Sequence, residues 1–271
     1  KIALDFGTDE TGLAGDLITG RLSSTWLHGA VAGGLKADVK LKLFSRKTVF
    51  AGYEGYSFDD PARVYEPESH DIFEGTLDEK GTAEIKARIS ARNVSPGALT
   101  ANFSTRVFEP GGAYSVDQFN LPYHPYDRYI GISVPRSDRN MNRLLTDTTH
   151  TVRIAALTPE GRPVKEGRVE IELYKINWRW WWQRGEESLA TYLGSSYYRP
   201  VKKEIVEIKD GKGDWRFEIK SPEWGRYLIR ARDADGKHIT GDIVYIGSPR
   251  WADSSMKEYQ EGATVLSFSS D

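Results

Sequence analysis

The sequence predicts an all-β protein made of two antiparallel β-sandwiches in tandem. Three observations support this fold class: apolar and polar residues alternate along several segments, turns containing glycine separate these segments, and the same order of segments occurs twice. The chain has 271 residues, which is enough for two domains of ordinary size, each able to bury a core without disulfides or metals.

Half-buried strands are predicted where apolar side chains occupy every second position. In residues 35–43, aliphatic side chains alternate with lysines and an aspartate, and the same pattern recurs at 83–89, 169–173 and 215–219. One face of each strand is therefore expected in a core and the other in water, as in antiparallel sandwiches and not in doubly wound parallel sheets. No long segment has a 3.6-residue apolar period, so at most a short helix is expected, near residues 139–145.

The turns between these segments place glycine next to polar residues, a combination typical of β-hairpins. Gly29 and Gly81 each precede a predicted strand in the first half, and Gly161 and Gly213 do so in the second half. Both second-half glycines follow their first-half counterparts by 132 positions. A repeat of this length indicates a duplicated domain and not a solenoid unit. The alternative is that two unrelated sandwiches share turn glycines by chance.

A segment with two prolines, residues 120–126, is the predicted joint between the domains. Proline restricts itself and its preceding residue to extended conformations, so the joint should be short and stiff. The predicted domains are residues 1–126 and 127–249, and residues 250–271 are expected to be a linker and the first strand of a following domain. Because the chain begins and ends in strand-like segments, we expect it to be part of a longer polypeptide.

Composition argues against several classes of function. The absence of cysteine excludes thiol nucleophiles, disulfides, thioesters and thiolate metal sites from this segment. A net charge of −2 gives no general attraction to nucleic acid or anionic membranes, and no apolar run is long enough to span a bilayer. We therefore expect no nucleic-acid partner and no direct membrane insertion by this segment.

No residue set has the spacing of a catalytic or metal site. The five histidines lack pairs at ligand spacing, and neither a Gly-x-Ser-x-Gly elbow nor a phosphate-binding Gly-Lys-Ser/Thr loop occurs. His70 and Asp71 are interpreted as part of a solvated acidic loop. Asp59 and Asp60 could contribute to a calcium site but lack the Asp-x-Asp-x-Gly pattern. The sequence therefore predicts no catalytic residue, cofactor or metal, and no enzyme.

The tryptophan-rich run at residues 178–182 is not fully explained by a sandwich core. On a strand, its first, third and fifth residues, all tryptophan, share one face, and Trp181 lies on the other. A core covers only one face, so three interpretations stay open: packing against a neighbouring domain, filling of a core, and a ligand or partner surface. The candidate interface or partner surface consists of Trp178, Trp180, Trp181, Trp182, Tyr197 and Tyr198.

Several segments resemble bacterial alpha-2-macroglobulins. Residues 51–58, Ala-Gly-Tyr-Glu-Gly-Tyr-Ser-Phe, resemble a tyrosine-rich segment of that family, and residues 173–182 with 222–228 resemble a second stretch. Residues 266–271 resemble the first strand of the next macroglobulin domain, so the resemblance covers essentially the whole chain. It implies macroglobulin domains, which are seven-stranded sandwiches of the fibronectin or immunoglobulin type.

The resemblance also implies a function. The parent would be a protease trap in which a bait region is cleaved, located in the periplasm or anchored at the cell surface. The thioester of some members needs a cysteine, which is absent here, and a bait region is expected beyond residue 271. This segment would then be scaffold, its partners being neighbouring macroglobulin domains and, through the full-length protein, host or competitor proteases. The alternative is a carbohydrate-binding or adhesive module that uses the tryptophan-rich surface for stacking.

Overall fold

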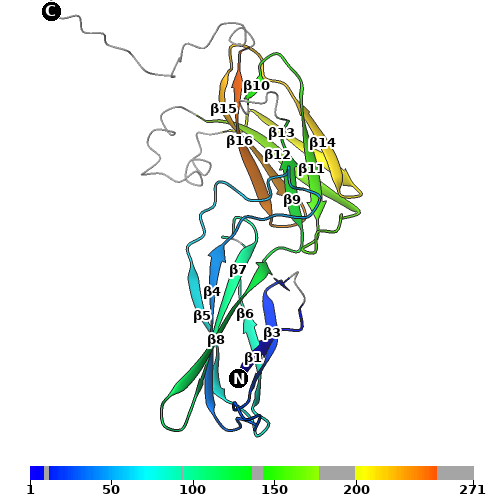
Figure 1. Cartoon of the computed structure of the whole chain (residues 1–271). Helices are drawn as coiled ribbons and strands as arrows, with labels where there is room; N and C mark the ends of the chain where they lie inside the picture. Colours follow the sequence, from blue (N-terminus) through cyan, green and yellow to red (C-terminus); the bar gives the residue numbers. More distant parts are fainter. Residues whose placement is uncertain (9–11, 93, 136–142, 177–198, 249–271) are drawn as a thin grey trace, which may run out of the picture.

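The computed structural model describes residues 1–8, 12–92, 94–135, 143–176 and 199–248. Within these ranges every regular element is a β-strand, and no helix capable of crossing a membrane is found there. The strands form two sandwiches that follow one another along an elongated molecule (Figure 1). The all-β prediction is confirmed.

In the first sandwich, one sheet has three strands and the other has five. The three-stranded sheet has the order β1 (Ile2–Asp5), β3 (Leu17–Ser24), β6 (Thr82–Arg88). The five-stranded sheet has the order β2 (Leu13–Ala14), β8 (Tyr114–His124), β7 (Leu99–Phe108), β4 (Lys36–Ser45), β5 (Glu68–Thr76). Neighbouring strands are antiparallel except for the short parallel pair β2–β8.

The second sandwich repeats this order strand for strand. The strands β9 (Tyr129–Ser133), β11 (His150–Leu157) and β14 (Lys212–Phe217) correspond to the three-stranded sheet. The strands β10 (Arg143–Leu145), β16 (Ile239–Gly247), β15 (Gly225–Asp233), β12 (Glu166–Ile176) and β13 (Lys202–Lys209) correspond to the five-stranded sheet. One pairing, between Lys209 and Lys212, joins the two layers into a single eight-stranded sheet.

Strands form where the sequence alternates because each sheet buries one face. Along β4, the four aliphatic residues from Ala37 to Leu43 are buried, and the lysines between them are exposed. In the second sandwich, the rings of Trp215 and Phe217 stack with centroids 4.8 Å apart. Fully burying one large apolar side chain stabilises a fold by about 2 kcal/mol. Each sandwich consequently has a core of its own.

The backbone pairing confirms the duplication. Isolated bridges join Thr25 to Val31 in the first sandwich and Leu157 to Pro163 in the second. Both residues of the second pair follow the first pair by 132 positions, the spacing expected from the sequence. The turns that these bridges enclose contain the same two backbone hydrogen bonds. The two sandwiches are therefore copies of one unit and share its register.

One of the two predicted glycine pairs, Gly81 with Gly213, was wrong. Gly81 directly precedes β6 with a φ of 70°, and Gly211 directly precedes β14 with a φ of 74°. Their carbonyls accept hydrogen bonds from the N–H groups of Ser24 and Ala156, which are 132 positions apart. Gly211, and not Gly213, is therefore the counterpart of Gly81. The equal spacing of 132 positions selected the wrong glycine because the β13–β14 connection is shorter than the β5–β6 connection.

Three further details differ from expectation. Each sandwich has eight strands in its described part and not seven. The reason is that its N-terminal segment forms one strand in the three-stranded layer (β1 or β9) and a second strand in the five-stranded layer (β2 or β10). Residues 143–145, expected near the end of a short helix, form β10 because they pair with β16, and residues 136–142 lie outside the described part. The joint expected at 120–126 is mostly strand, since β8 continues to His124 and four residues separate it from β9.

Candidate functional site at the junction of the two sandwiches

The β4–β5 connection of the first sandwich, residues 46–67, builds the junction with the second sandwich (Figure 1). Ser57 exchanges two backbone hydrogen bonds with Ile132 of β9, at 2.9 and 3.0 Å. β9 is the outermost strand on its side of the sheet, and such a strand leaves alternate N–H and C=O groups without a ladder partner. The first sandwich therefore supplies partners to the free edge of the second.

Aromatic rings fill the junction. A buried cluster of Phe50, Phe58, Tyr126, Tyr129 and Leu157 draws residues from both sandwiches. The ring centroids of Phe50 and Phe58 are 4.9 Å apart and those of Phe50 and Tyr129 are 5.4 Å apart, both in edge-to-face geometry. Pairs of this kind stabilise by about 1 kcal/mol beyond the burial of their surface. The cluster thus couples the two sandwiches energetically.

Two glycines of the second sandwich allow this close approach. A Cβ atom on Gly131 would lie 2.6 Å from Cζ of Phe58, closer than carbon atoms pack. A Cβ atom on Gly241 would lie 3.0 Å from Cδ of Pro61. Neither glycine has a positive φ, so the reason for glycine is space: at Gly131 the ring of Phe58 takes it, and at Gly241 Pro61 and the carbonyl of Ile229 take it together.

A buried carboxylate joins the sandwiches electrostatically. The side chain of Asp60 is fully buried, and its Oδ2 lies 2.8 Å from Nη2 of Arg230 on β15. Nε of Arg63 lies 3.4 Å from the same oxygen, and Ala62 donates its N–H to Oδ1 at 3.0 Å. Charged groups buried in this way depend on one another, because loss of one leaves the other desolvated without its partner.

Hydrogen bonds from β16 reach the same connection. Oγ1 of Thr240 donates to the carbonyl of Ser57 at 2.8 Å, and the N–H of Gly241 donates to the carbonyl of Asp59 at 3.1 Å. The carboxylate of Asp59 accepts hydrogen bonds from the hydroxyl and the N–H of Thr48, while burial raises its pKa. The connection is therefore bonded to β16 and is also held together by hydrogen bonds within itself.

His238 lies inside the junction as a neutral side chain. It is fully buried, with its ring centroid 4.8 Å from that of Tyr126 and 4.7 Å from that of Tyr129. Its Nδ1 accepts the N–H of Ile130 at 2.9 Å. Burial lowers the pKa of His238 to about 3, so the ring carries no charge at neutral pH. A histidine in this state contributes to packing and is not tuned for proton transfer near pH 7.

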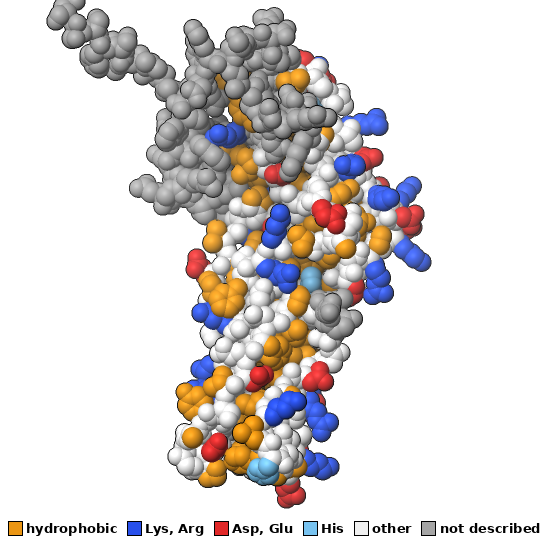
Figure 2. Space-filling view, viewed as in Figure 1, with side chains coloured by type: hydrophobic (Ala, Val, Ile, Leu, Met, Phe, Trp, Pro, Cys, Tyr) orange, Lys and Arg blue, Asp and Glu red, His pale blue; other side chains and the backbone are white. Residues whose placement is uncertain are grey.

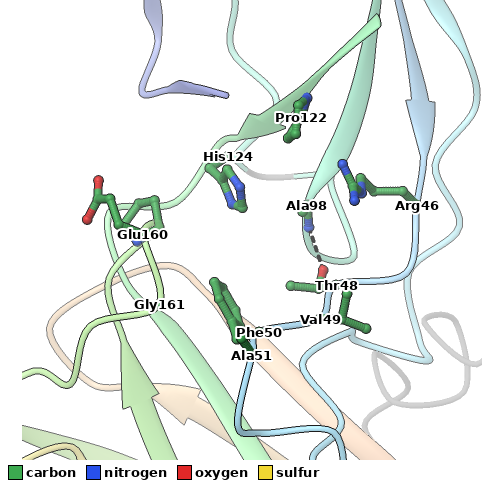
Figure 3. Close-up of a pocket in the computed structure, with 11 residues that line it drawn as sticks. Arg46, Thr48, Val49, Phe50, Ala51, Ala98, Pro122, His124, Glu160 and Gly161 are labelled. Atoms are coloured by element: carbon green, nitrogen blue, oxygen red, sulfur yellow. Dashed lines mark hydrogen bonds between the residues drawn. The ribbon is translucent and has the colours of Figure 1, made fainter. Parts of the chain in front are cut away.

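A cavity of about 300 Å³ lies beside the aromatic cluster, between the sandwiches (Figure 3). It is lined by Arg46, Thr48, Val49, Phe50, Ala51, Ala98, Pro122 and His124 from the first sandwich and by Pro159, Glu160 and Gly161 from the second. Oγ1 of Thr48 accepts the N–H of Ala98 at 2.7 Å. The Glu160 carboxylate accepts hydrogen bonds from Thr158 and Arg162, which lower its pKa, and it points away from the other lining side chains.

The predicted tryptophan and tyrosine surface lies outside the described residues. This applies to Trp178, Trp180, Trp181, Trp182, Tyr197 and Tyr198, so their packing stays a prediction. In the described part, the junction includes residues 51–58 and His238, and the sequence drew attention to residues 51–58 only through a family resemblance. The signal that could have found this connection is its length and its density of rings, since long ordered loops are commonly functional.

The residues considered for metal or acid–base chemistry have structural partners. Among the residues described, no three His, Asp or Glu side chains gather as metal ligands. His70 and Asp71 lie in β5, so the prediction that they form a loop was wrong. β5 is the outermost strand of its sheet, and such a strand accommodates charged residues because much of it is exposed to solvent. Asp59 and Asp60, considered for calcium, are engaged inside the junction.

Comparisons with known proteins identify the two sandwiches. A family described as the bacterial alpha-2-macroglobulin MG5 domain matches residues 1–125, and one described as bacterial macroglobulin domain 6 matches residues 131–248. The sandwiches are therefore macroglobulin domains. Together the matches span nearly the whole chain, and the chain belongs to the bacterial alpha-2-macroglobulin family.

Solved structures of this family have the same fold. The trypsin-activated alpha-2-macroglobulin of Escherichia coli has a TM-score of 0.58 at 18% identity, and its native form a TM-score of 0.55 at 18% identity. The Salmonella protein reacted with methylamine has a TM-score of 0.54 at 19% identity. Each match covers 91% of this chain, which spans only 16% of the length of these relatives. A comparison with curated protein sequences finds no match.

Proposed function

We propose that this chain forms part of the frame of a protease trap and has no catalytic activity of its own. The coarser assignment, a scaffold segment of an alpha-2-macroglobulin-like protein, follows from its two macroglobulin domains. The trapping function is supported by the similar structures, which include the Escherichia coli protein activated by trypsin and by porcine elastase.

The junction is the observation that favours a frame. A protein whose mobile parts change shape needs rigid bodies against which the change is directed. Here the edge bridge at Ser57, the ring cluster around Phe58 and the buried pair of Asp60 with Arg230 all act between the same two domains. Such contacts favour one relative orientation of the two domains over a flexible arrangement.

The remaining assignments are part of the same proposal. We assign the domains to residues 1–126 and 127–249, with residues 250–271 leading into a further domain. The partners are neighbouring macroglobulin domains of the same chain and, through the full-length protein, host or competitor proteases. An extracytoplasmic location, in the periplasm or anchored at the cell surface, fits a protein that meets such proteases.

The test uses the full-length protein that contains this chain. It is mixed with several unrelated proteases, and its shape is followed by small-angle scattering while retained protease is measured by gel filtration. We expect limited cleavage outside residues 1–248, a large change of shape and retention of the protease. Cleavage that neither changes the shape nor retains protease contradicts the trapping function.

A further inference from the structure

Each sandwich has an end at which its first strand begins. This end is buried in the junction in the second sandwich and exposed in the first. In the second sandwich this end faces the junction, where Leu157, His238 and Thr240 are buried. In the first sandwich it lies away from the junction (Figure 1). We call the surface there the β1 end, which consists of Ile2, Leu4, Leu27, Val31 and Val116.

Leu4 of β1 is the counterpart of Ile132 of β9. Leu4 pairs with Leu22, Ile132 pairs with Ile154, and these two partners are 132 positions apart. Ile132 is the residue whose backbone groups bond to Ser57 across the junction. Its counterpart belongs to a strand that, in the described part of the chain, pairs with β3 alone.

The outer edge of β1 presents hydrogen-bonding groups at two residues. The N–H of Thr25 donates to the carbonyl of Lys1 at 2.9 Å, which makes these a hydrogen-bonded pair. The alternation of an antiparallel ladder then directs the N–H and C=O groups of Ile2 and Leu4 away from β3. An extended segment can pair with such an edge by adding itself to the sheet.

Large apolar side chains are exposed around this edge. Leu27 is 98% exposed, and Val31 and Val116 are each 50% exposed. Val116 corresponds through the strand pairings to Ile239, which is only 6% exposed and directly precedes Thr240, whose hydroxyl bonds to Ser57 in the junction. Figure 2 shows hydrophobic side chains among charged ones at this end of the molecule. Both surfaces are therefore apolar, but the one in the junction is buried and the one at the β1 end is exposed.

We propose that the β1 end is the docking surface for a preceding macroglobulin domain of the same full-length protein. The occupant is that domain's β4–β5 connection, which pairs one residue with the edge of β1 and places apolar side chains against Leu27, Val31 and Val116. The template is the junction within this chain, where the β4–β5 connection pairs Ser57 with Ile132 of the corresponding strand and packs Phe58 over Gly131. The proposal rests on the assignment of the chain as a scaffold segment.

Two substitutions between the copies define what this occupant must look like. The counterpart of Gly131 is Ala3, whose Cβ takes the space that the ring of Phe58 uses in the junction. The counterpart of Arg230 is Ser104, which offers no cation to a buried carboxylate. The occupant therefore has a residue smaller than phenylalanine after its bridging residue and no buried carboxylate like Asp60.

These requirements disfavour a second copy of this chain as the occupant. Its own β4–β5 connection would bring Phe58 against Ala3 and would bury Asp60 without a cation. Burying an unpaired charge is strongly unfavourable. The geometry points to another domain of the same polypeptide.

The experiment compares the full-length protein with this 271-residue chain, without protease, so that its outcome is independent of trapping. Hydrogen exchange of β1 is measured in both. We expect exchange at Leu4 to be slower by about tenfold or more in the full-length protein. The variant Leu27→Asp should remove this protection, while Ile205→Asp, at a 57% exposed aliphatic on β13, should leave it unchanged.

A photo-crosslinking residue at position 27 of the full-length protein identifies the occupant. Cross-links to the β4–β5 connection of the preceding domain support the proposal. Equal exchange of β1 in both proteins overturns it, as do cross-links that map to a second copy of the protein or to a domain later in the chain.

Discussion

The end of the second sandwich that faces the junction, here the β9 end, corresponds to the β1 end of the first sandwich in a duplicated fold. Described residues of this chain cover the β9 end, which is the closed end, and leave the β1 end open. Both present the edge of a first strand with apolar residues around it. They differ at single positions, with Gly131 and Arg230 at the closed end against Ala3 and Ser104 at the open one. If the proposal for the β1 end holds, the comparison teaches that the sandwich supplies the docking geometry, while a few side chains determine which partner fits.

Removing the central ring of the closed end should have the largest effect. Phe58→Ala deletes a fully buried side chain that packs over Gly131, and we expect the free energy of unfolding to fall by about 4 kcal/mol. Urea-induced unfolding followed by fluorescence measures the loss. Leu27→Ala at the open end is the matched control, since that side chain is 98% exposed and its truncation should cost little. Similar losses in both variants would remove the distinction between the ends.

The buried ion pair should come next. Asp60→Ala removes the buried carboxylate that pairs with Arg230 and Arg63, and we expect a loss of about 3 kcal/mol in the same measurement. Asp71→Ala removes the carboxylate of a solvent-exposed pair and should change stability little. If the two variants unfold at the same urea concentration, Asp60 does not couple the domains.

Exchanging the small residues of the two ends sharpens the comparison. Gly131→Ala forces a Cβ into the ring of Phe58 and should destabilise by about 2 kcal/mol. Ala3→Gly, the reverse change at the open end, should cost less than about 1 kcal/mol through backbone entropy alone. Urea unfolding of both variants checks the pair, and a neutral Gly131→Ala would mean that the ring can move aside.

The pH dependence of stability should also come from the closed end. The pKa of folded His238, about 3, lies below that of an unfolded histidine, about 6.5. The unfolded state therefore binds a proton first as the pH falls, so stability is full above pH 6.5 and decreases toward pH 3. Between pH 7 and pH 5, wild type should lose about 2 kcal/mol more than His238→Gln. Parallel pH profiles of the two proteins would show that His238 is not kept neutral.

Much of the fold could be predicted from the sequence because it is written in local patterns. Alternation at residues 35–43 anticipates β4, since the period of a strand is fixed by backbone geometry. The 132-residue spacing anticipates the duplication, but it assigned Gly213 in place of Gly211 because loop lengths vary between copies. The acidic residues of β5 were taken for a loop because exposed strands carry little apolar signal.

The candidate site could be predicted only in part. The rings in residues 51–58 are visible in the sequence, but nothing local indicates that Ser57 meets Ile132, 75 positions away. The neutrality of His238 comes from rings contributed by the end of one sandwich and the start of the next. Such sites are properties of tertiary packing, and the glycine at position 131 has a reason only once Phe58 is in place.

The most direct test of the central claim measures the distance between the two domains. The chain contains no cysteine, so Lys86→Cys on β6 and Arg216→Cys on β14 provide two specific sites for spin labels on exposed positions. Pulsed electron spin resonance should give one narrow distance distribution, which broadens when Asp60→Ala is added. A broad distribution in the otherwise unaltered chain would contradict the account, because the junction would then not hold the two domains as one frame.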